Sequence, residues 1–347
     1  MATMKEIAKL AKVSTATVSH VLSGKKQVKE ATRKRVEDAI EKTNYTLNNI
    51  AKSLRMNKTH TIGVLVEDIR GLPVPEIVNG ISEQLEQQGY QILLNNLRLL
   101  EKLYNQYDHI TMYRTIINDG IRVLLDAHVD GIIYVAMHDR RFDGIIDPPG
   151  KPLVYAYAHS SVPGDVFATY NNFDSAKDMT RLLLQKGHRR IGLIAGHAHS
   201  FPCKERILGF ESAMAEAGVA VQPEYIRWGD WEYRSGETLC EELLSLPTPP
   251  SAIFSLNDLM AAGCLAAIHK RGLRIPEDIS LAGFDNRDFA SCLYPPLTTI
   301  ALPNREIGCQ SAQMLLTLLN DKDAEVQSQI LPCALFVRNS VGTAPKE

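Results

Sequence analysis

The sequence predicts a small all-α head followed by a larger α/β body that contains two doubly wound parallel sheets. Three features indicate this division: the charge distribution, the helical spacing of apolar residues in the head, and the alternation of strands and helices in the body. Residues 1–60 carry thirteen Lys and Arg against five Asp and Glu, a net charge of +8, whereas the other 287 residues carry −10. This contrast is typical of a nucleic-acid-binding module joined to a part that stays away from phosphates.

The bulk composition is that of an ordinary globular protein. The length of 347 residues allows two or three domains, and 45% of the residues are hydrophobic. No apolar run approaches the roughly 18–20 residues that span a bilayer, and the first residues lack the apolar core of a secretory signal. The six cysteines form neither a C-x-x-C motif nor a Cys/His cluster. We therefore expect free thiols in a cytoplasmic protein, without a membrane segment, rather than disulfides or a metal site.

The head begins with a helix over residues 4–11, in which apolar residues recur at helical spacing. Thr3 is expected to cap the amino terminus of this helix, with Glu6 as the reciprocal partner in a capping box. A three-residue break over 12–14 follows, so the first helix is predicted to be short.

Two more helices complete the predicted head. A second helix is expected over 16–22, capped by Ser14 or Thr15, and a third over 30–42. The apolar faces of these two helices are predicted to contribute Val18, Val21, Leu22, Val36, Ala39 and Ile40 to the core of the head. Two short helices joined by a tight turn form a helix-turn-helix, in which the second helix enters the major groove of DNA.

The start of the second helix carries small side chains that suit contacts with base pairs. Thr15 and Ala16 can place methyl groups against a thymine methyl group. The hydroxyl groups of Thr15, Thr17 and Ser19 can reach phosphates or base edges. A solvated helical bundle with a lysine-rich face is the alternative interpretation, because charge alone does not distinguish the two.

The segment from Met4 to Tyr45 resembles the N-terminal domain of the lactose-repressor/purine-repressor family of bacterial regulators. Residues 13–20, VSTATVSH, match the recognition-helix signature of that family without a gap. The resemblance implies that Thr15, Ala16 and His20 face base edges. The full set of DNA-binding residues predicted in this way is Thr15, Ala16, Thr17, Ser19, His20, Lys26, Leu54 and Arg55.

Residues 48–55 resemble the hinge helix of the same family, which folds when two subunits lie side by side on operator DNA. By this resemblance Leu54 is the wedge that enters between base pairs from the minor groove, and Arg55 lies against the groove edge or the phosphates. Unstacking costs on the order of a few kcal/mol, which the contacts of the kinked duplex offset. The chain departs from the family at Leu47, where many members have Pro, and at Lys12, where Gly or Asn is common. We expect mild left-handed strain at Lys12.

From residue 61 onward the chain alternates buried strands with helices. Strands are predicted over 61–66, 90–94, 131–135, 153–156, 190–194, 252–255 and 280–284. Helices are predicted over 75–88 and along a long stretch that ends at 127. Such alternation implies parallel sheets with right-handed crossovers, and there are enough strands for two lobes.

An α/β enzyme would show the same alternation, so the motifs have to distinguish the classes. Neither G-x-G-x-x-G nor G-x-x-x-x-G-K-[ST] opens a helix, and G-x-S-x-G does not occur. No constellation of acid, base and nucleophile is apparent either. We therefore expect a protein that is not an enzyme and that binds no cofactor. The solute-binding protein of a transporter remains a second alternative, although it would require export.

Residues 187–192, 283–286 and 295–300 resemble the effector-binding half of the same regulator family. The resemblance covers nearly all of residues 2–341 and is weakest over 97–128, where an additional segment is expected. It implies a periplasmic-binding-protein-like body with two lobes, three crossover strands and a ligand cleft between the lobes. Open α/β sheets bind ligands beyond the carboxyl ends of their strands, which agrees with this placement. The implied effector-binding residues are Val74, Arg206, Trp231, Asn257 and Asp285.

The chemistry of these residues suits a sugar. Arg206 presents a fork of donors to hydroxyl or carboxylate groups, and Asp285 can accept hydrogen bonds from paired hydroxyls. Trp231 offers an apolar face to a sugar ring, and Asn257 can donate and accept. An interlobe salt bridge between Arg206 and Asp285, with Trp231 as a core aromatic, is the alternative. Purine-binding members carry aromatic residues where this chain has Pro73 and Val74, so the effector is predicted to be a sugar or sugar derivative.

The predicted domains are a helix-turn-helix domain over 1–46, a hinge helix and linker over 47–60, and an effector-binding and dimerisation domain over 61–341. Within the last domain, the first lobe is expected over 61–169 and 301–328, and the second over 170–300 and 329–341. The predicted function is that of a repressor whose homodimer binds a pseudo-palindromic operator in double-stranded DNA under the control of a small-molecule effector, a carbohydrate. No leucine heptad follows the last strand, which favours a dimer over a tetramer.

Overall fold

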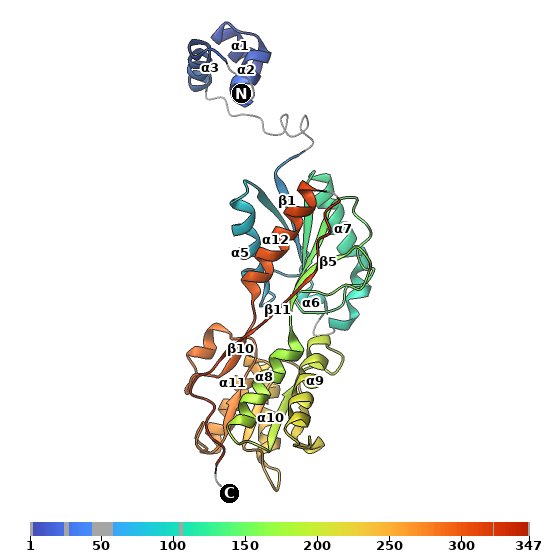
Figure 1. Cartoon of the computed structure of the whole chain (residues 1–347), viewed down its shortest axis with the longest axis vertical. Helices are drawn as coiled ribbons and strands as arrows, with labels where there is room; N and C mark the ends of the chain where they lie inside the picture. Colours follow the sequence, from blue (N-terminus) through green and yellow to red (C-terminus); the bar gives the residue numbers. More distant parts are fainter. Residues whose placement is uncertain (1–2, 24–27, 44–57, 104–106, 322, 346–347) are drawn as a thin grey trace. The chain divides into compact units, whose positions relative to one another are not determined.

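The computed structural model describes residues 3–23, 28–43, 58–103, 107–321 and 323–345. The chain divides into two compact units, Met1–Thr59 and His60–Glu347 (Figure 1). The first unit is the head and the second is the body. No helix among the described residues is long and apolar enough to cross a membrane.

Among its described residues, the head has three helices around one small core. They are α1 (Met4–Ala11), α2 (Thr15–Ser23) and α3 (Glu30–Thr43). Ile7, Val18 and Val36 are fully buried and bring the three helices together. Of the predicted core residues, Val18, Val36 and Ala39 are buried, and Val21, Leu22 and Ile40 pack against them while half-buried.

The ends of the first two helices are set by local hydrogen bonds. Thr3 and Glu6 form the predicted capping box, with the side chain of each accepting from the backbone N–H of the other. Lys12 ends α1 in the left-handed conformation (φ 56°, ψ 48°), as predicted. The Ser14 hydroxyl accepts from the backbone N–H of Thr17 at 3.1 Å, so Ser14 rather than Thr15 caps α2. The predicted hinge helix over 48–55 lies outside the described residues.

The first lobe of the body is built on a six-stranded parallel sheet with the order β11-β5-β4-β3-β1-β2. Its strands are β1 (Thr61–Val66), β2 (Gln91–Asn96), β3 (Gly131–Val135), β4 (Leu153–Ala156), β5 (Val166–Tyr170) and β11 (Gln329–Leu331). Its helices are α5 (Val74–Glu86), α6 (Leu100–Leu103), α7 (Arg114–Asp126) and α12 (Asn304–Asn320), with the 3-10 helix η1 (Tyr107–Tyr113) before α7. For β1, β3 and β4, the first and last residues agree with the predicted strands over 61–66, 131–135 and 153–156.

Helices α5 and α12 pack side by side in the first lobe (Figure 1). Glycine is required where they meet, because a Cβ atom on Gly80 would lie 2.1 Å from the carbonyl oxygen of Arg305. A Cβ atom on Gly308 would lie equally close to the carbonyl oxygen of Ile77. The pair of glycines therefore permits a close contact between two segments that are far apart in the sequence.

The second lobe is built on a four-stranded parallel sheet with the order β7-β6-β8-β9. Its strands are β6 (Ile191–Ala195), β7 (Ile226–Trp228), β8 (Ala252–Ser255) and β9 (Ser280–Ala282), and an antiparallel pair is formed by β10 (Thr299–Ala301) and β12 (Ala334–Phe336). Its helices are α8 (Asn172–Gln185), α9 (Phe201–Glu216), α10 (Tyr233–Leu244) and α11 (Asp258–Lys270), with the 3-10 helices η2 (Pro223–Tyr225) and η3 (Asp288–Ser291). Two doubly wound sheets are thus present, as predicted.

The chain passes between the two lobes three times. It crosses between β5 and α8, between β10 and α12, and between β11 and β12. The expected lobe boundary at 328 is wrong, because residues 329–331 form β11 and pair with β5 in the sheet of the first lobe. The short strand escaped prediction because its residues are largely exposed and lack the apolar run of a buried strand.

The long helix predicted to end at 127 is also wrong in its extent. Strand β2 continues to Asn96, and the segment that follows contains a short helix, a 3-10 helix and then α7. Asp68 Oδ2 accepts a hydrogen bond from the backbone N–H of Leu100 at 3.1 Å. Asp68 follows β1, and its hydrogen bond fixes the first residue of α6. The residues around 100 do not reveal this contact by themselves, because its acceptor lies about thirty positions earlier in the sequence.

Candidate functional site

The predicted DNA-contact residues that the structure describes lie on α2 of the head. Thr15 and Ala16 are exposed, and Thr17, Ser19 and His20 are half-buried. The Thr17 hydroxyl lies 2.9 Å from that of Ser14 and belongs to the helix cap, so it is less available to DNA than predicted. The predicted contacts Lys26, Leu54 and Arg55 lie outside the described residues.

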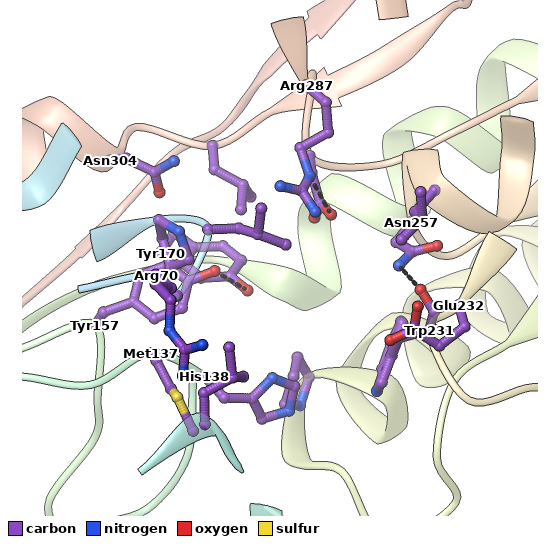
Figure 2. A pocket seen from close by; sticks show the side chains of 18 of the residues that line it. Arg70, Met137, His138, Tyr157, Tyr170, Trp231, Glu232, Asn257, Arg287 and Asn304 are labelled. Carbon is purple, nitrogen blue, oxygen red and sulfur yellow. Dashed lines mark hydrogen bonds and ion pairs between the residues drawn. The ribbon is translucent and has the colours of Figure 1, made fainter. Parts of the chain in front are cut away.

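The body encloses a cavity of about 350 Å³ between its two lobes (Figure 2). Its lining comes from segments that follow the carboxyl ends of parallel strands, which is where open α/β sheets bind ligands. The first lobe contributes Arg70 after β1, His138 after β3 and Tyr157 after β4, and the second contributes Asn257 after β8 and Asp285 after β9. The predicted interlobe position of the cleft is confirmed.

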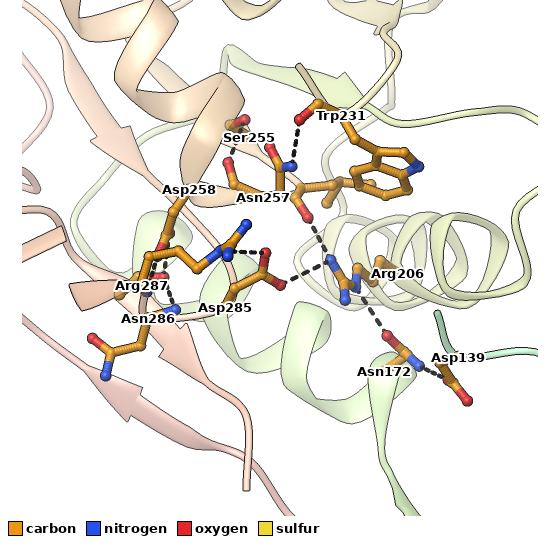
Figure 3. Close-up of polar contacts among 12 residues, drawn as sticks. Asp139, Asn172, Arg206, Trp231, Ser255, Asn257, Asp258, Asp285, Asn286 and Arg287 are labelled. Atoms are coloured by element: carbon orange, nitrogen blue, oxygen red, sulfur yellow. Dashed lines mark hydrogen bonds and ion pairs between the residues drawn. The ribbon is translucent and has the colours of Figure 1, made fainter. Parts of the chain in front are cut away.

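Arg206 lies at the centre of a buried hydrogen-bond network beside this cavity (Figure 3). Its side chain is 4% exposed. Its Nε donates to Asn172 Oδ1 at 2.9 Å, Nη1 to the carbonyl oxygen of Leu256 at 2.5 Å, and Nη2 to the Tyr170 hydroxyl at 3.0 Å. The guanidinium also stacks on Phe284, with 3.7 Å from its carbon to the ring centroid. Arg206 is therefore held rigidly, with its polar edge largely used by the protein.

Asp285 lies between two arginines. Its Oδ1 is 3.7 Å from Arg206 Nη1, and its Oδ2 is 3.8 Å from Arg287 Nε (Figure 3). Both distances exceed those of charge-assisted hydrogen bonds, which are about 2.7–2.9 Å. Burial raises the pKa of Asp285, although Arg206 and Arg287 oppose the shift. The residue has a φ of 110°, so it stands in the left-handed region on a turn that projects it toward the cavity.

Asp258 stabilises the turn that carries Asp285 by accepting two hydrogen bonds. Its Oδ2 accepts from the backbone N–H of Arg287 at 2.8 Å, and its Oδ1 accepts from the Thr299 hydroxyl at 2.6 Å. Burial and the charge of Asp285 raise the pKa of Asp258 to about 7. The negative charge of Asp285 disfavours ionisation of Asp258, because like charges repel strongly away from water.

Asn257 and Trp231 line the cavity, as predicted, but the amide of Asn257 is occupied. Its Oδ1 accepts from the backbone N–H of Met260 as the cap of α11, and its Nδ2 donates to the carbonyl oxygen of Trp231 at 2.9 Å. Trp231 has a φ of 73°, and its ring lies over Gly196, where a Cβ atom would come within 2.0 Å. Asn257 thus holds the backbone that presents the indole.

The prediction of Val74 as a ligand contact is wrong. Val74 is fully buried in the core of the first lobe, and its neighbour Pro73 lines the cavity instead. Val74 is the first residue of α5, and its side chain points into the core rather than toward the cavity. A resemblance in sequence does not specify the direction of this side chain.

Several lining residues were not predicted. Among them are Arg70, Met137, His138, Tyr157, Tyr170, Arg287 and Asn304. His138 Nε2 lies 3.0 Å from the hydroxyl of Ser200, which joins the first lobe to the start of α9 in the second. Burial, Arg140 and Arg206 hold the pKa of His138 well below its usual range, so this imidazole is neutral. Met137, His138 and Tyr157 closely follow strands, and this position was the signal that could have indicated them.

His188 has a structural role. It is fully buried, and its ring nitrogens lie 2.9 Å from the Ser251 hydroxyl and 3.0 Å from the Ser280 hydroxyl. All six cysteines are free, and no cluster of three or more metal-ligating side chains occurs among the described residues.

Comparisons with known proteins agree with this organisation. The family described as "Bacterial regulatory proteins, lacI family" matches residues 3–48, and the "Periplasmic binding protein-like domain" matches residues 180–341. The chain is 34% identical to the HTH-type transcriptional repressor PurR of Aliivibrio fischeri (strain MJ11), with 98% of each chain covered. It is also 34% identical to the HTH-type transcriptional repressor CytR of Escherichia coli (strain K12), covering 99% of this chain and 97% of that one.

Solved structures show the same likeness. The Lac repressor dimer bound to operator and the anti-inducer ONPF has a TM-score of 0.80 and 27% identity, with 98% of this chain and 99% of that chain covered. A complex of the transcriptional regulator CelR with cellobiose has a TM-score of 0.64 and 27% identity, with 98% and 100% covered.

The fold and the two sites define a two-part regulator with a helix-turn-helix head and a two-lobed ligand-binding body. The chain belongs to the lacI family of bacterial regulatory proteins. This family consists of transcriptional regulators that have a DNA-binding domain and an effector-binding domain.

Proposed function

We propose that this protein is a cytoplasmic repressor that binds a pseudo-palindromic operator as a homodimer and responds to a small molecule in the interlobe cavity. It has no enzymatic role in this proposal. The observation that carries the proposal is the pairing, in one chain, of an exposed recognition-type helix with a cavity between two lobes. The repressors PurR and CytR, to which the chain is similar over nearly its whole length, support it.

In the head, we assign base contacts to Thr15, Ala16 and His20, and a phosphate or base contact to Ser19. The amino-terminal turn of α2 is exposed at Thr15 and Ala16, so it can approach a base edge without a change in the helix. The positive charge of residues 1–60 supplies the affinity for phosphates that is independent of sequence. A dimer with two such heads reads two half-sites related by twofold symmetry.

In the body, we assign effector contacts to Asp285 and the face of Trp231. Arg206 also lines the cavity, where its hydrogen bonds to the protein hold it in one position for contact with the effector. Arg206 belongs to the second lobe but donates to Asn172 and Tyr170 at the crossing between the lobes. Asn172 Nδ2 donates in turn to Asp139 Oδ2 of the first lobe at 2.8 Å (Figure 3). A ligand that contacts Arg206 thus acts on a chain of bonds that spans both lobes, which is a route for coupling its binding to DNA affinity.

The test uses the full-length protein and a pool of random duplexes. Repeated selection should enrich a palindromic sequence, and its affinity should fall steeply as salt concentration rises, since phosphate contacts release counterions. Fluorescence anisotropy with the selected duplex measures both properties. A flat response to salt, or no enriched sequence, would contradict the proposal.

Two variants separate base contacts from phosphate contacts. Replacing both Thr15 and His20 with Ala should lower the preference for the selected sequence over a scrambled one by roughly ten- to a hundredfold. The matched control Lys34→Gln removes one charge from α3 and should weaken binding to both duplexes by the same factor. Equal loss of preference in the two variants would contradict the role of α2.

A further inference from the structure

We infer that the ligand of the interlobe cavity is a small polyhydroxylated anion whose carboxylate or phosphate group binds Arg287. This inference rests on the proposed function and deepens it, because it names the chemical class of the effector.

Arg287 has a half-buried guanidinium that makes one long ion pair, with Asp285, and no hydrogen bond to a described residue. Its side chain is 16% exposed and lines the cavity, into which it reaches from the turn after β9 (Figure 2). The backbone N–H of Arg287 is fixed by Asp258, but Nε stays 3.8 Å from Asp285 Oδ2. Among the described residues, no side chain or carbonyl accepts a hydrogen bond from this guanidinium. A cation with little exposure to water gains stability when an acceptor pairs with it at hydrogen-bond distance.

The other two arginines of the cavity are already satisfied. Arg206 donates three hydrogen bonds within the protein, as described above. Arg70 is half-exposed, and its guanidinium binds Asp68 at 3.2 Å and Glu101 at 2.9 Å. Arg287 is therefore the arginine, of these three, whose donors are used least by the protein.

The charges around Arg287 favour an anion. The single carboxylate of Asp285 faces both Arg206 and Arg287, so this group of three carries one uncompensated positive charge. Burial raises the pKa of Asp258 to about 7, so this neighbouring acid does not supply a full negative charge near neutral pH. Glu232 is exposed and lies across the cavity from Arg287 (Figure 2).

The rest of the lining suits hydroxyl groups and one apolar face. Asp285 accepts hydrogen bonds from hydroxyls, and the indole of Trp231 offers an apolar surface. The hydrogen bonds of a guanidinium to a carboxylate or a phosphate are charge-assisted and roughly twice as strong as those to the hydroxyls of a neutral sugar. The volume of about 350 Å³ suits a molecule of monosaccharide size. A sugar acid or a sugar phosphate combines these features.

The experiment measures binding of matched pairs to the full-length protein by isothermal titration calorimetry. The probes are D-gluconate, D-galactonate, D-glucuronate and D-galacturonate, each beside its parent D-glucose or D-galactose, and the monophosphates of both sugars. At least one anion should bind about ten- to a hundredfold more tightly than its uncharged parent, which is the range for a hydrogen bond to a charged group. Comparison of the affinities of the sugar acids with those of the sugar monophosphates identifies whether a carboxylate or a phosphate is preferred.

Three variants place the preference on Arg287. In Arg287→Gln the ratio of affinities between the anion and its parent should fall close to one, whereas Arg287→Lys should retain part of it because the charge remains. The matched variant Arg274→Gln removes a guanidinium that lies outside the cavity and is paired with Asp278, and it should leave the ratio unchanged. Binding of the selected operator duplex shows that each variant is folded.

Two results would overturn the inference. One is an uncharged sugar, or a purine, that binds as tightly as every anion or more tightly. The other is a preference for anions that persists in Arg287→Gln. Failure of all probes to bind also overturns the inference, while retained operator binding and a response to another small molecule would leave the proposed function intact. Loss of operator binding by the wild-type protein would instead contradict the proposed function.

Discussion

Two buried arginine–carboxylate clusters of the body differ in how completely their members are paired. In the first lobe, Glu67 is fully buried, and its Oε2 lies 2.7 Å from Arg140 Nη2. The same carboxylate accepts from the Tyr134 hydroxyl at 2.7 Å and from the backbone N–H of Met137 at 3.0 Å. In the second lobe, the oxygens of Asp285 remain 3.7 and 3.8 Å from their two arginines.

The difference separates a structural ion pair from a site that is kept available for a ligand. A buried carboxylate with all its partners at hydrogen-bond distance needs nothing further, and removal of one partner leaves a charge uncompensated. A carboxylate that stands about 1 Å beyond hydrogen-bond distance from each guanidinium has acceptor capacity left over. We therefore expect changes in the first cluster to affect folding and changes in the second to affect binding.

The largest expected effect is on the first cluster. Arg140→Met should lower the free energy of unfolding of the body by about 3–5 kcal/mol, because Glu67 would remain buried without its counter-ion. Urea unfolding followed by circular dichroism and tryptophan fluorescence measures this change. The double variant Glu67→Leu with Arg140→Met should recover much of the loss, and a double variant less stable than the single one would contradict the assignment.

The second prediction concerns pH and Asp258, beside the second cluster. An acid whose pKa is raised from 3.8 to about 7 on folding binds more protons in the folded state, so its contribution to the free energy of unfolding falls as pH rises between these values. The variant Asp258→Asn lacks this titration. Its stability relative to the wild type should therefore increase from pH 4 to pH 7 by on the order of 1–3 kcal/mol. A difference between the two proteins that is independent of pH would contradict the raised pKa.

The third prediction tests Asp285 itself. Asp285→Asn should change the free energy of unfolding by less than about 1 kcal/mol, because no short ion pair is lost. Effector binding should nevertheless be lost or reduced more than tenfold, as measured by the fluorescence of Trp231. The exposed Asp288→Asn is the matched control and should alter neither quantity. A large loss of stability in Asp285→Asn would show that this cluster is structural as well.

The smallest expected effect is on the contact between the lobes. Ser200→Ala removes the hydrogen bond to His138, which contributes about 0.5–1.5 kcal/mol. Since this bond joins the two lobes, its loss should speed ligand dissociation by roughly two- to tenfold in stopped-flow fluorescence. Ser291→Ala, within the second lobe alone, should leave the dissociation rate unchanged. Equal rates in Ser200→Ala and the wild type would mean that this bond does not hold the lobes together.

Parts of the fold that depend on neighbouring residues were predictable. The helix over 4–11 and its capping box rest on contacts between residues three and four positions apart. The strands over 61–66, 153–156 and 252–255 are continuous apolar runs that lie buried on both faces of a sheet. The short exposed strand over 329–331 has no such run, and only its pairing with β5 makes it a strand.

In the candidate site too, features that depend on residues distant in the sequence were not predictable. Arg206, Trp231 and Asp285 were predicted by resemblance, and all three line the cavity. Val74 was misplaced because a shift of one residue along α5 turns a side chain from the cavity to the core. Arg287 was missed because its importance depends on a partner that its surroundings do not supply, and a sequence does not display unused hydrogen-bond donors.

Residue types and their local spacing were enough to reveal a basic helical head, an acidic body of two parallel sheets, and the regulator family to which the chain belongs. Hydrogen bonds and apolar spacing within a few residues carry that information. Which side chains meet around the cavity, and which of them are left unsatisfied, depends on how the fold brings together residues 70, 138, 206 and 287, which lie far apart in the sequence on three loops and one helix. A difference of about 1 Å separates the Glu67–Arg140 ion pair from the longer contacts of Asp285, and such distances arise only when segments far apart in the sequence pack together within a lobe.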